Sequence, residues 1–465
     1  MTGWIEDPAV LFPDAANAQS ALGNSHYAAR QDARESNART YARRMRLAIR
    51  RAKGMLLTDV EGKTYYDCLA AAGTLTLGHN HPAVVQALQQ ALASEVPFQA
   101  LDIATPIKDE FTDALLGTLP PDFASRARVQ FCSPSGSDAI EAAIKLVRTA
   151  TGRQTMLAFD GGYHGMTQGA LSLMGNTHAK AALGGLGQAT QFLPYPNAFR
   201  CPFGVGGEQT ASISASYIRS LLSDPEGGLL PAGLVTELVQ GEGGVIPSPD
   251  GWARELRAIT RDLDIPLVVD EVQTGWGRTG ALYAFQHPGI TPDVLVLSKA
   301  IGGGLPLSVI VYDKDLDLWQ GGAHAGTFRG NTLAMATGLA TLRVLREQDL
   351  PRHAAAMGAR MTRHLREIQG ECAILGDVRG RGLMLGVEVV DPQGKPDALG
   401  HCPADGATAR RVQKECLDRG LIVEMGGRHG AVARFLPPLV ITPDEVDAVC
   451  GIFRDACLAV MRSPA

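Results

Sequence analysis

The chain has 465 residues and a formal net charge of −5; 45% of its residues are hydrophobic and 20% are charged. These proportions are ordinary for a soluble globular enzyme, and the length allows for about two to four domains. The weak negative charge gives no reason to expect nucleic acid or an anionic membrane as a partner. No run approaches the ~18 apolar residues of a membrane-spanning helix. We therefore expect small-molecule substrates and no membrane partner.

The N-terminus and the cysteines indicate the compartment. Residues 1–7 lack the basic start and apolar stretch of a signal peptide. The chain has eight cysteines, and no two are spaced as Cys-x-x-Cys or lie beside a histidine pair at zinc-ligand spacing. They look like reduced cytosolic thiols. We expect a cytoplasmic protein without a bound metal.

The first 80 residues contain a polar segment followed by a hairpin. Residues 1 to about 35 show weak periodicity, which predicts an arm that is either mobile or laid over a partner subunit. Residues 54–67 are typical of two strands joined by a Glu-Gly-Lys turn. Pro82 stands at the favoured first position of a helix that we expect over residues 83–94.

The middle of the chain alternates short apolar runs with helical stretches. Strands are predicted at 128–132, 155–159, 233–238, 266–269, 293–298 and 308–312, and helices at 138–149 and 251–263. Strands that are apolar on both faces and separated by helices indicate a mostly parallel sheet covered on both sides.

The last third of the chain has a different composition. A helix-rich stretch runs from about residue 332 to 368. An α/β segment follows, with strands expected at 383–390 and 421–425 and a final helix at 442–461. This change predicts a second, smaller C-terminal domain.

Lys299 follows the apolar run Val294–Ser298, which predicts a buried strand. Desolvation at such a position lowers the pKa of a lysine and makes its amine a nucleophile toward carbonyls. A second buried strand ends at Asp270. A lysine and an aspartate at the same ends of neighbouring strands suit pyridoxal phosphate (PLP): the lysine forms the Schiff base and the carboxylate keeps the pyridine nitrogen protonated. Each residue alone would more often be a solvated loop or turn residue.

Three further loops follow predicted strands. Cys132–Asp138 precedes a helix, so its backbone N–H groups form either an anion site or a simple helix cap. In Gly161–Gly165 an aromatic residue flanked by glycines suits stacking on a flat ring, or a packed tyrosine in a loop. Glu237–Gly244 carries two carboxylates that are either solvated or placed at a ligand crevice. The chain lacks a P-loop at the first of these positions and a dinucleotide-binding glycine motif.

Together these segments resemble the class III (ω-amino acid) aminotransferases, which are PLP enzymes of fold type I. The matching segments are Ser135–Ala139, Gly162–Gly165, Glu237–Gly244, Asp270–Gly280, Ser298–Gly304 and Gly326–Asn331. They occur in the family's order within a resemblance that covers roughly residues 38 to 460. The family implies an α/β fold with a large, mostly parallel seven-stranded sheet and a smaller α/β C-terminal domain. We expect an N-terminal arm and part of the small domain in 1–80, a large PLP-binding domain in 81–331 and the small domain in 332–465.

The resemblance implies catalytic roles for residues at the strand ends. Lys299 binds the cofactor covalently and later moves a proton at the substrate carbon. Asp270 pairs with the pyridinium nitrogen, and Glu237 lies close to it. Tyr163 stacks on the ring, with His164 beside it.

The resemblance also implies how the rest of the cofactor is held. Ser135, Gly136 and Ser137 bind the phosphate, with Thr327 contributed by the other subunit. Gln273 lies near the phenolic oxygen of the ring. The family therefore implies a homodimer with shared active sites, and a tetramer is the alternative.

Arg434 is the candidate for binding a substrate carboxylate. It lies in Val432–Leu439, which resembles the C-terminal family segment whose arginine has this role, and a guanidinium matches a carboxylate bidentately. In the family, Glu242 covers that arginine when an ω-amine substrate is bound. Without the resemblance, Arg434 would be assigned to a surface strand.

Departures from the common pattern indicate a branch of the family. Arg329 stands where many members have glycine, and Leu238 stands where proline is frequent. Ser137-Asp138 replaces the commoner Thr-Glu. Arg329, with residues 68–75 and 78–82, resembles the branch that exchanges the C4 amine between L-2,4-diaminobutyrate and 2-oxoglutarate. That branch makes diaminobutyrate from aspartate 4-semialdehyde and glutamate for siderophore, diaminopropane or ectoine synthesis.

Three alternatives remain open at this level. The first is another ω-aminotransferase, acting on ornithine, acetylornithine, lysine or 4-aminobutyrate. The second is a PLP aminomutase or racemase, which needs no second substrate. The third is a non-catalytic binding or scaffold protein, and the presence of both Lys299 and Asp270 argues against it.

Overall fold

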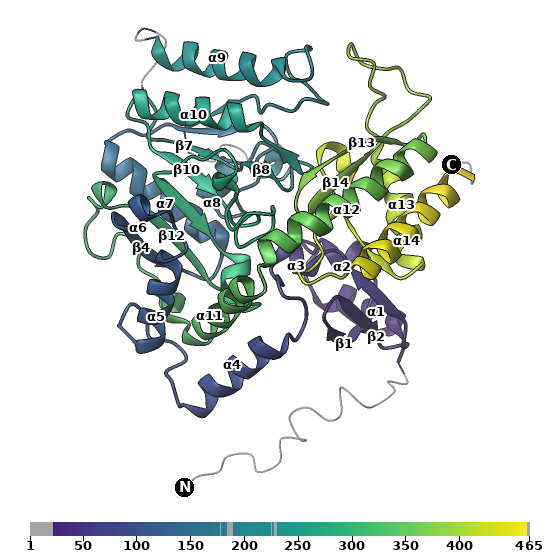
Figure 1. Ribbon diagram of the computed structural model, residues 1–465, viewed down its shortest axis with the longest axis horizontal. Helices are drawn as coiled ribbons and strands as arrows, with labels where there is room; N and C mark the ends of the chain where they lie inside the picture. The colour runs from purple at the N-terminus through teal and green to yellow at the C-terminus, as the bar shows by residue number, and fades with distance from the viewer. Residues whose placement is uncertain (1–21, 177, 184–188, 225, 227–229, 463–465) are drawn as a thin grey trace.

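The computed structural model describes residues 22–176, 178–183, 189–224, 226 and 230–462 (Figure 1). The first 21 residues of the expected N-terminal arm lie outside this range. Two groups of strands stand side by side in Figure 1, one on the left around β10 and β12 and one on the right around β13 and β14.

A seven-stranded sheet forms the larger of the two groups. Its order is β4 (Ala127–Cys132), β12 (Ser308–Asp313), β11 (Val294–Leu297), β10 (Leu267–Asp270), β7 (Gly233–Thr236), β5 (Met156–Phe159) and β6 (Thr190–Leu193). Only β12 runs antiparallel to its neighbours. The predicted large, mostly parallel sheet is confirmed. The edge strand β6 was not predicted.

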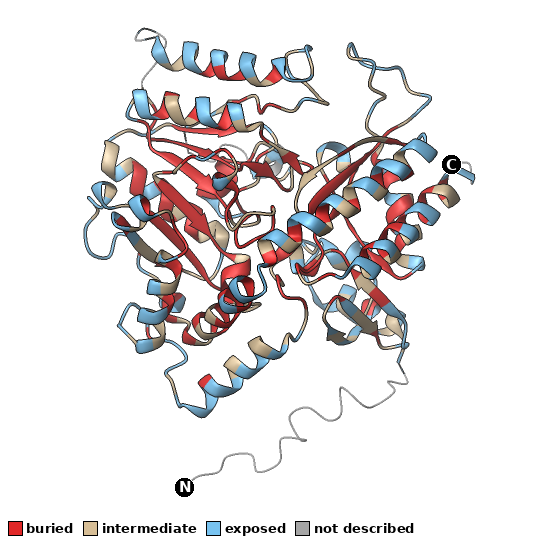
Figure 2. Ribbon diagram, in the orientation of Figure 1, coloured by how far each residue is buried: buried red, intermediate tan, exposed pale blue. Residues whose placement is uncertain are grey.

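Alternate residues of the strands enter two separate apolar clusters. Val268 on β10 and Val296 on β11 pack toward α7 (Gly136–Thr151). Their neighbours Val269 and Leu297 pack on the other side, in the cluster that includes α10 (Asp250–Asp262). This alternation is the period of two that a strand imposes on its side chains. The sheet is therefore covered on both faces, as its continuous apolar strands predict (Figure 2).

Helices at the edges complete this half of the molecule. The helix α11 (Thr332–Glu347) packs against α4 (Pro82–Ala93) and α5 (Pro106–Leu116). The remaining helices here are α6 (Pro121–Ala124), α8 (Gln168–Ser172) and α9 (Gln209–Ser223), and the short pair β8 (Val239–Gln240) and β9 (Ile246–Pro247) lies beyond β7. The helix predicted after Pro82 is confirmed.

Two four-stranded sheets form the second group. One has the order β1 (Ile49–Lys53), β2 (Leu56–Asp59), β3 (Thr64–Asp67) and β15 (Leu421–Ile422). The other has the order β13 (Leu375–Arg381), β14 (Met384–Val389), β17 (Val432–Phe435) and β16 (Glu424–Gly426). The predicted hairpin is the antiparallel pair β2–β3. Because β3 also pairs with β15, strands from the two ends of the chain share one sheet.

Helices accompany both small sheets. The long helix α12 (Leu350–Glu371) packs against α14 (Pro443–Arg462) and β13, and α13 (Gly406–Asp418) packs against α14. The N-terminal helices are α1 (Asn24–Arg34), α2 (Tyr41–Arg44) and α3 (Ala70–Gly73). The division of the chain into domains stays a prediction.

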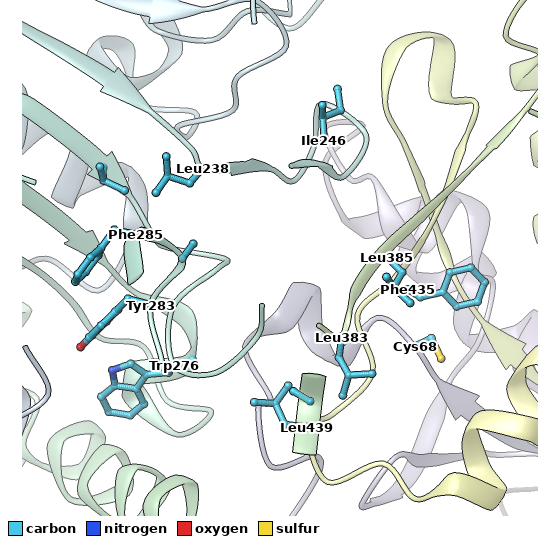
Figure 3. Packing of buried hydrophobic residues seen from close by; sticks show 14 of the residues in the cluster. Cys68, Leu238, Ile246, Trp276, Tyr283, Phe285, Leu383, Leu385, Phe435 and Leu439 are labelled. Carbon is cyan, nitrogen blue, oxygen red and sulfur yellow. The ribbon is translucent and has the colours of Figure 1, made fainter. Parts of the chain in front are cut away.

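One apolar cluster joins the two groups of strands (Figure 3). It contains Trp276 and Tyr283 from the segment after β10, together with Leu383 and Leu439 from the C-terminal part. A Cβ at Gly277 would lie 2.9 Å from Leu439 Cδ1, so this segment touches the C-terminal part directly. The buried Arg278 donates hydrogen bonds to the carbonyl groups of Leu383 and Pro437. These contacts fix the position of β17 relative to the large sheet.

Two expectations from composition can be compared with the structure. All eight cysteines are free thiols, as predicted. Within the described residues, no helix has both the length and the apolar character needed to cross a membrane.

Candidate active site

Lys299 and Asp270 lie at the same edge of the large sheet. Strands β10 and β11 are parallel neighbours, with Asp270 opposite Val296. Asp270 ends its strand and is 5% exposed. Lys299 follows two residues after the end of β11. The prediction that these two strands are neighbours is confirmed.

The backbone at Lys299 has an uncommon conformation. Its φ is +49°, in the left-handed region that residues other than glycine seldom adopt. Ser298 holds the preceding position by donating a hydrogen bond of 2.9 Å to the carbonyl of Leu307. Burial lowers the pKa of the Lys299 amine, although the charges of Glu242 and Asp270 act in the opposite direction. An amine with a lowered pKa is more often in the free-base form that attacks carbonyls.

Asp270 belongs to a buried group of charges. His164 Nδ1 lies 2.8 Å from Asp270 Oδ2, and the backbone N–H of Val272 donates to Oδ1 at 3.0 Å. Burial would lower the pKa of His164, but the hydrogen bond and charge of Asp270 outweigh it and raise that pKa. Glu237 accepts hydrogen bonds from the backbone of Tyr163 and Gly241, each at 3.0 Å. Burial raises the pKa of Glu237 to about 7, with a further contribution from Asp270.

The start of α7 lies against the two strand ends. Ser135 caps this 16-residue helix, and its side chain accepts a hydrogen bond from the N–H of Ser137. A Cβ added at Gly136 would lie 2.9 Å from the side chain of Val272 and 3.5 Å from that of Ser298. A glycine is therefore needed for this close approach. The helix dipole at this end favours an anion.

Ser137 and Gly165 bring the next loop to the same place. The hydroxyl of Ser137 lies 2.8 Å from Thr167 Oγ1 and accepts a hydrogen bond from the Thr167 N–H at 3.0 Å. A Cβ at Gly165 would collide with Ser137. This loop also carries Tyr163, which is partly exposed. Sequence reasoning did not identify Thr167, because its identification requires knowing that the loop of Ser137 and the loop of Gly165 meet.

Gln273 connects the site to the N-terminal part of the chain. Its side-chain N–H donates to the carbonyl of Ala72 at 3.0 Å. The residues Ala70, Ala71 and Ala72 all have positive φ, between 46° and 58°. Such strain concentrates at functional sites. A side chain at Gly241 would overlap Gln273, so the loop that carries Glu242 also lies here.

Arg434 lies between two carboxylates. It is fully buried on β17, which rules out the alternative of a surface strand residue. Its Nη2 atom is 2.7 Å from Glu242 Oε1 and 2.5 Å from Glu424 Oε2. Burial opposes the charge of Arg434, but the two carboxylates outweigh it and raise its pKa. Arg434 and Glu242 are thus in contact, and their roles in substrate binding stay predictions.

Glu424 is a second residue that sequence reasoning missed. It lies directly opposite Arg434 because β16 and β17 are antiparallel neighbours. Nothing in the local sequence reveals this register, since the two residues are on different strands. Tyr41 of α2 also lies near this group; burial is the main cause that raises its pKa, and the charge of Glu424 contributes.

Thr327 lies in a different part of the structure. It begins the short helix Thr327–Gly330, which contacts β4. With His324 and Arg329 it lines a cavity of about 790 Å³. Its role as a phosphate ligand from a second subunit stays a prediction.

The groups that meet at the sheet edge fit PLP. A buried amine, a buried carboxylate and a helix N-terminus match the aldehyde, the ring nitrogen and the phosphate of this cofactor. The amine belongs to Lys299, the carboxylate to Asp270 and the helix N-terminus to Gly136. As predicted, these groups come from separate segments of the sequence. The individual roles of these residues stay predictions.

Comparisons with known proteins agree with this geometry. The sequence model of the family described as aminotransferase class-III matches residues 38–457. A diaminobutyrate--2-oxoglutarate aminotransferase from Rhizobium meliloti is 56% identical over 95% of this chain and 94% of its own length. A protein of the same name from Haemophilus influenzae is 46% identical over 95% of this chain and 97% of its own length.

Solved structures share the fold. An amine transaminase from an uncultivated Pseudomonas species, determined in its PLP-bound form, superposes with a TM-score of 0.80 at 30% identity, covering 92% of this chain and 97% of that one. The ornithine aminotransferase of Toxoplasma gondii gives a TM-score of 0.81 at 25% identity, covering 98% and 99%. The predicted PLP fold type I is confirmed, and the chain belongs to the class III aminotransferases.

Proposed function

We propose that this aminotransferase exchanges the C4 amine between L-2,4-diaminobutyrate and 2-oxoglutarate, forming aspartate 4-semialdehyde and glutamate. In the cell the reaction would run toward diaminobutyrate. The observation that carries the proposal is the likeness to two relatives named for this activity, at 56% and 46% identity over nearly the whole chain. The buried Arg434 with its two glutamates supports it, because both substrates carry carboxylates.

The cofactor is PLP, which when bound withdraws electrons from the substrate carbon that carries the reacting amine. Lys299 supplies the amine that binds it and moves a proton at that carbon. Asp270, oriented by His164, keeps the ring nitrogen protonated. Gly136 and Ser137 at the start of α7 hold the phosphate, and Tyr163 covers the ring.

Arg434 and Glu242 differ in burial, which suits an exchange of substrates. The side chain of Arg434 is fully buried, whereas that of Glu242 is 36% exposed. Glu242 can therefore leave while Arg434 stays. In this proposal Glu242 covers Arg434 when the ω-amine substrate is bound. It withdraws when the α-carboxylate of glutamate takes its place with a bidentate ion pair.

The assembly and location belong to the same proposal. The protein acts as a cytoplasmic homodimer in which Thr327 of one subunit reaches the phosphate site of the other. The cavity beside Thr327 and the free state of all eight cysteines support this. Sedimentation of the holoenzyme measures the subunit number directly.

Steady-state assays test the substrate assignment. The holoenzyme is supplied with 2-oxoglutarate and, in turn, diaminobutyrate, ornithine, acetylornithine, lysine or 4-aminobutyrate, and glutamate is measured. We expect the highest kcat/KM with diaminobutyrate and one glutamate formed per donor consumed. A higher value with another donor, or turnover without a keto acid, would contradict the proposal.

A further inference from the structure

Two carboxylates share a single guanidinium at the substrate end of the site. Glu242 and Glu424 both lie within 2.7 Å of Arg434 Nη2. Arg434 is fully buried, and the side chain of Glu424 is only 10% exposed. One positive charge does not neutralise two negative ones, and an uncompensated charge is costly where water is excluded. A second cation near these glutamates is Lys299, which the proposed function assigns to PLP, so the pair provides for one additional cation from a ligand.

Hydrogen-bonding groups remain unpaired at the same place. Glu424 Oε2 is close to Arg434 but not aligned with any donor, and it has no hydrogen-bond partner among the described residues. Arg434 Nε and Nη1 are likewise without an acceptor there. An unpaired acceptor beside unpaired donors complements an ammonium and a carboxylate. A diamino acid carries these two groups together on its C2 atom.

Glu424 is held more firmly than Glu242. It lies on β16, directly opposite Arg434 of β17, and its side chain is only 10% exposed, with Tyr41 nearby. Glu242 lies in the loop after β8 and is 36% exposed. The two acids thus differ in how firmly they are packed. In the proposed exchange of substrates Glu242 moves and Glu424 stays in place. Burial raises the pKa of Glu424, so its charge is best maintained beside a bound cation.

We propose that Glu424 binds the C2 ammonium of the diamino acid and thereby selects diamino donors over monoamines of the same length. The inference rests on the proposed function and adds a specificity-determining residue to it. Glu424 and Glu242 share Arg434, and the loop that carries Glu242 lies against Gln273, close to the strand ends that carry the reacting groups. 4-Aminobutyrate provides the critical comparison, because it equals diaminobutyrate in chain length and lacks only the C2 ammonium.

The test compares these two donors in the wild-type holoenzyme and in Glu424→Gln. Loss of a hydrogen bond between charged groups corresponds to about 10- to 100-fold in kcat/KM. We expect a loss of this size with diaminobutyrate, at least 10-fold greater than any loss with 4-aminobutyrate. The KM for 2-oxoglutarate should not rise, because removing an acid leaves Arg434 more available to a carboxylate. Tyr41→Phe should show a smaller loss with the same preference.

Glu388→Gln serves as the matched control. Glu388 is another buried glutamate of the same sheet, on β14, where it pairs with Arg200 and Arg379. Its replacement should leave the ratio of the two donors unchanged. If Glu424→Gln lowers kcat/KM equally for both donors, or for neither, the inference is overturned. If that variant does not fold, the donor ratio in Tyr41→Phe decides, and an unchanged ratio overturns the inference.

Failure of the proposed function gives a different result. A wild-type enzyme that rejects diaminobutyrate contradicts that assignment alone. The same comparison is then made with ornithine and 5-aminopentanoate, which differ by the same ammonium group. A Glu424→Gln variant that keeps the wild-type ratio for this pair would overturn the role of Glu424 as well.

Discussion

His164 and Asp270 are 106 positions apart in the sequence, yet His164 Nδ1 lies 2.8 Å from Asp270 Oδ2. Both side chains are almost completely buried. The raised pKa of His164 favours a protonated ring that donates to the carboxylate. This hydrogen bond, together with the one from the Val272 N–H, fixes the orientation of the Asp270 carboxylate. Its orientation is therefore set before any ligand arrives.

Replacement of Asp270 by asparagine should remove that charge while keeping the shape of the side chain. We expect kcat with diaminobutyrate to fall at least ~100-fold, the effect of losing a preorganised electrostatic contact to the reacting group. PLP should still bind through Lys299 and the start of α7. Stopped-flow or steady-state assays with PLP in excess measure the change. A variant with wild-type kcat would show that Asp270 does not act on the cofactor.

Replacement of Lys299 by alanine should abolish covalent attachment of PLP. Borohydride reduction followed by mass spectrometry should show the cofactor bound to wild-type protein and absent from the variant, and turnover should disappear. Lys395→Ala is the control, because Lys395 is exposed. Cofactor trapped on another lysine of the variant, with turnover preserved, would contradict the assignment.

Replacement of Arg434 by alanine should weaken glutamate binding. The lost charge-assisted contact corresponds to about 2–5 kcal/mol in a buried site. The KM for glutamate should therefore rise far more than the KM for an amine that lacks a carboxylate. The two constants are measured side by side in the same preparation. Equal increases would rule out a carboxylate-binding role for Arg434.

The raised pKa of Glu237 should make stability depend on pH. Native Glu237 has a pKa of about 7, against an ordinary value of 4.5. Between these values the native state holds a proton that the unfolded state has released, so stability falls as pH rises toward about 7 and then levels off. From pH 5.5 to 8 this contribution is about 2 kcal/mol.

Glu237→Gln mimics the neutral acid and should lack this decline. Melting temperatures of the holoenzyme at pH 5.5 and 8 measure this decline. The melting temperature of the wild type should fall more between these pH values than that of the variant. Glu255→Gln, at an exposed position on α10, is the control and should behave as the wild type does. Identical pH dependence in wild type and Glu237→Gln would show that Glu237 is already ionised at pH 5.5.

The sequence was sufficient to predict the strands β10 and β11 of the large sheet and the site at their carboxyl ends. Strands β10 and β11 were predicted within about a residue, because runs such as Val294–Leu297 are apolar without interruption. The charged residues at or just after their ends, Asp270 and Lys299, stand out against such a background. The strand β5, which follows α7, was also predicted from its apolar run. Local pattern therefore carries the information for this half of the site.

The other half depends on contacts that local pattern does not contain. Glu424 meets Arg434 only through the register of β16 and β17, and these strands are separated by a turn of irregular backbone at His429. Tyr41 reaches Glu424 from a helix almost four hundred residues away in the chain. The strand β13 was missed because charged residues and glycines interrupt its apolar pattern, and one of them, Arg379, is accommodated by ion pairs with Asp377 and Glu388.

The pairing of β3 with β15 orders events during synthesis. All seven strands of the large sheet lie before residue 314, whereas β15, Glu424 and Arg434 come near the end of the chain. A ribosome therefore releases Lys299, Asp270 and α7 well before the segment that carries Glu424 and Arg434. Until β15 is synthesised, β3 has β2 as a neighbour on one side and no strand on the other. A product truncated before β15 would retain Lys299, Asp270 and the start of α7 while lacking Glu424 and Arg434, so it would separate the two sets of proposed roles.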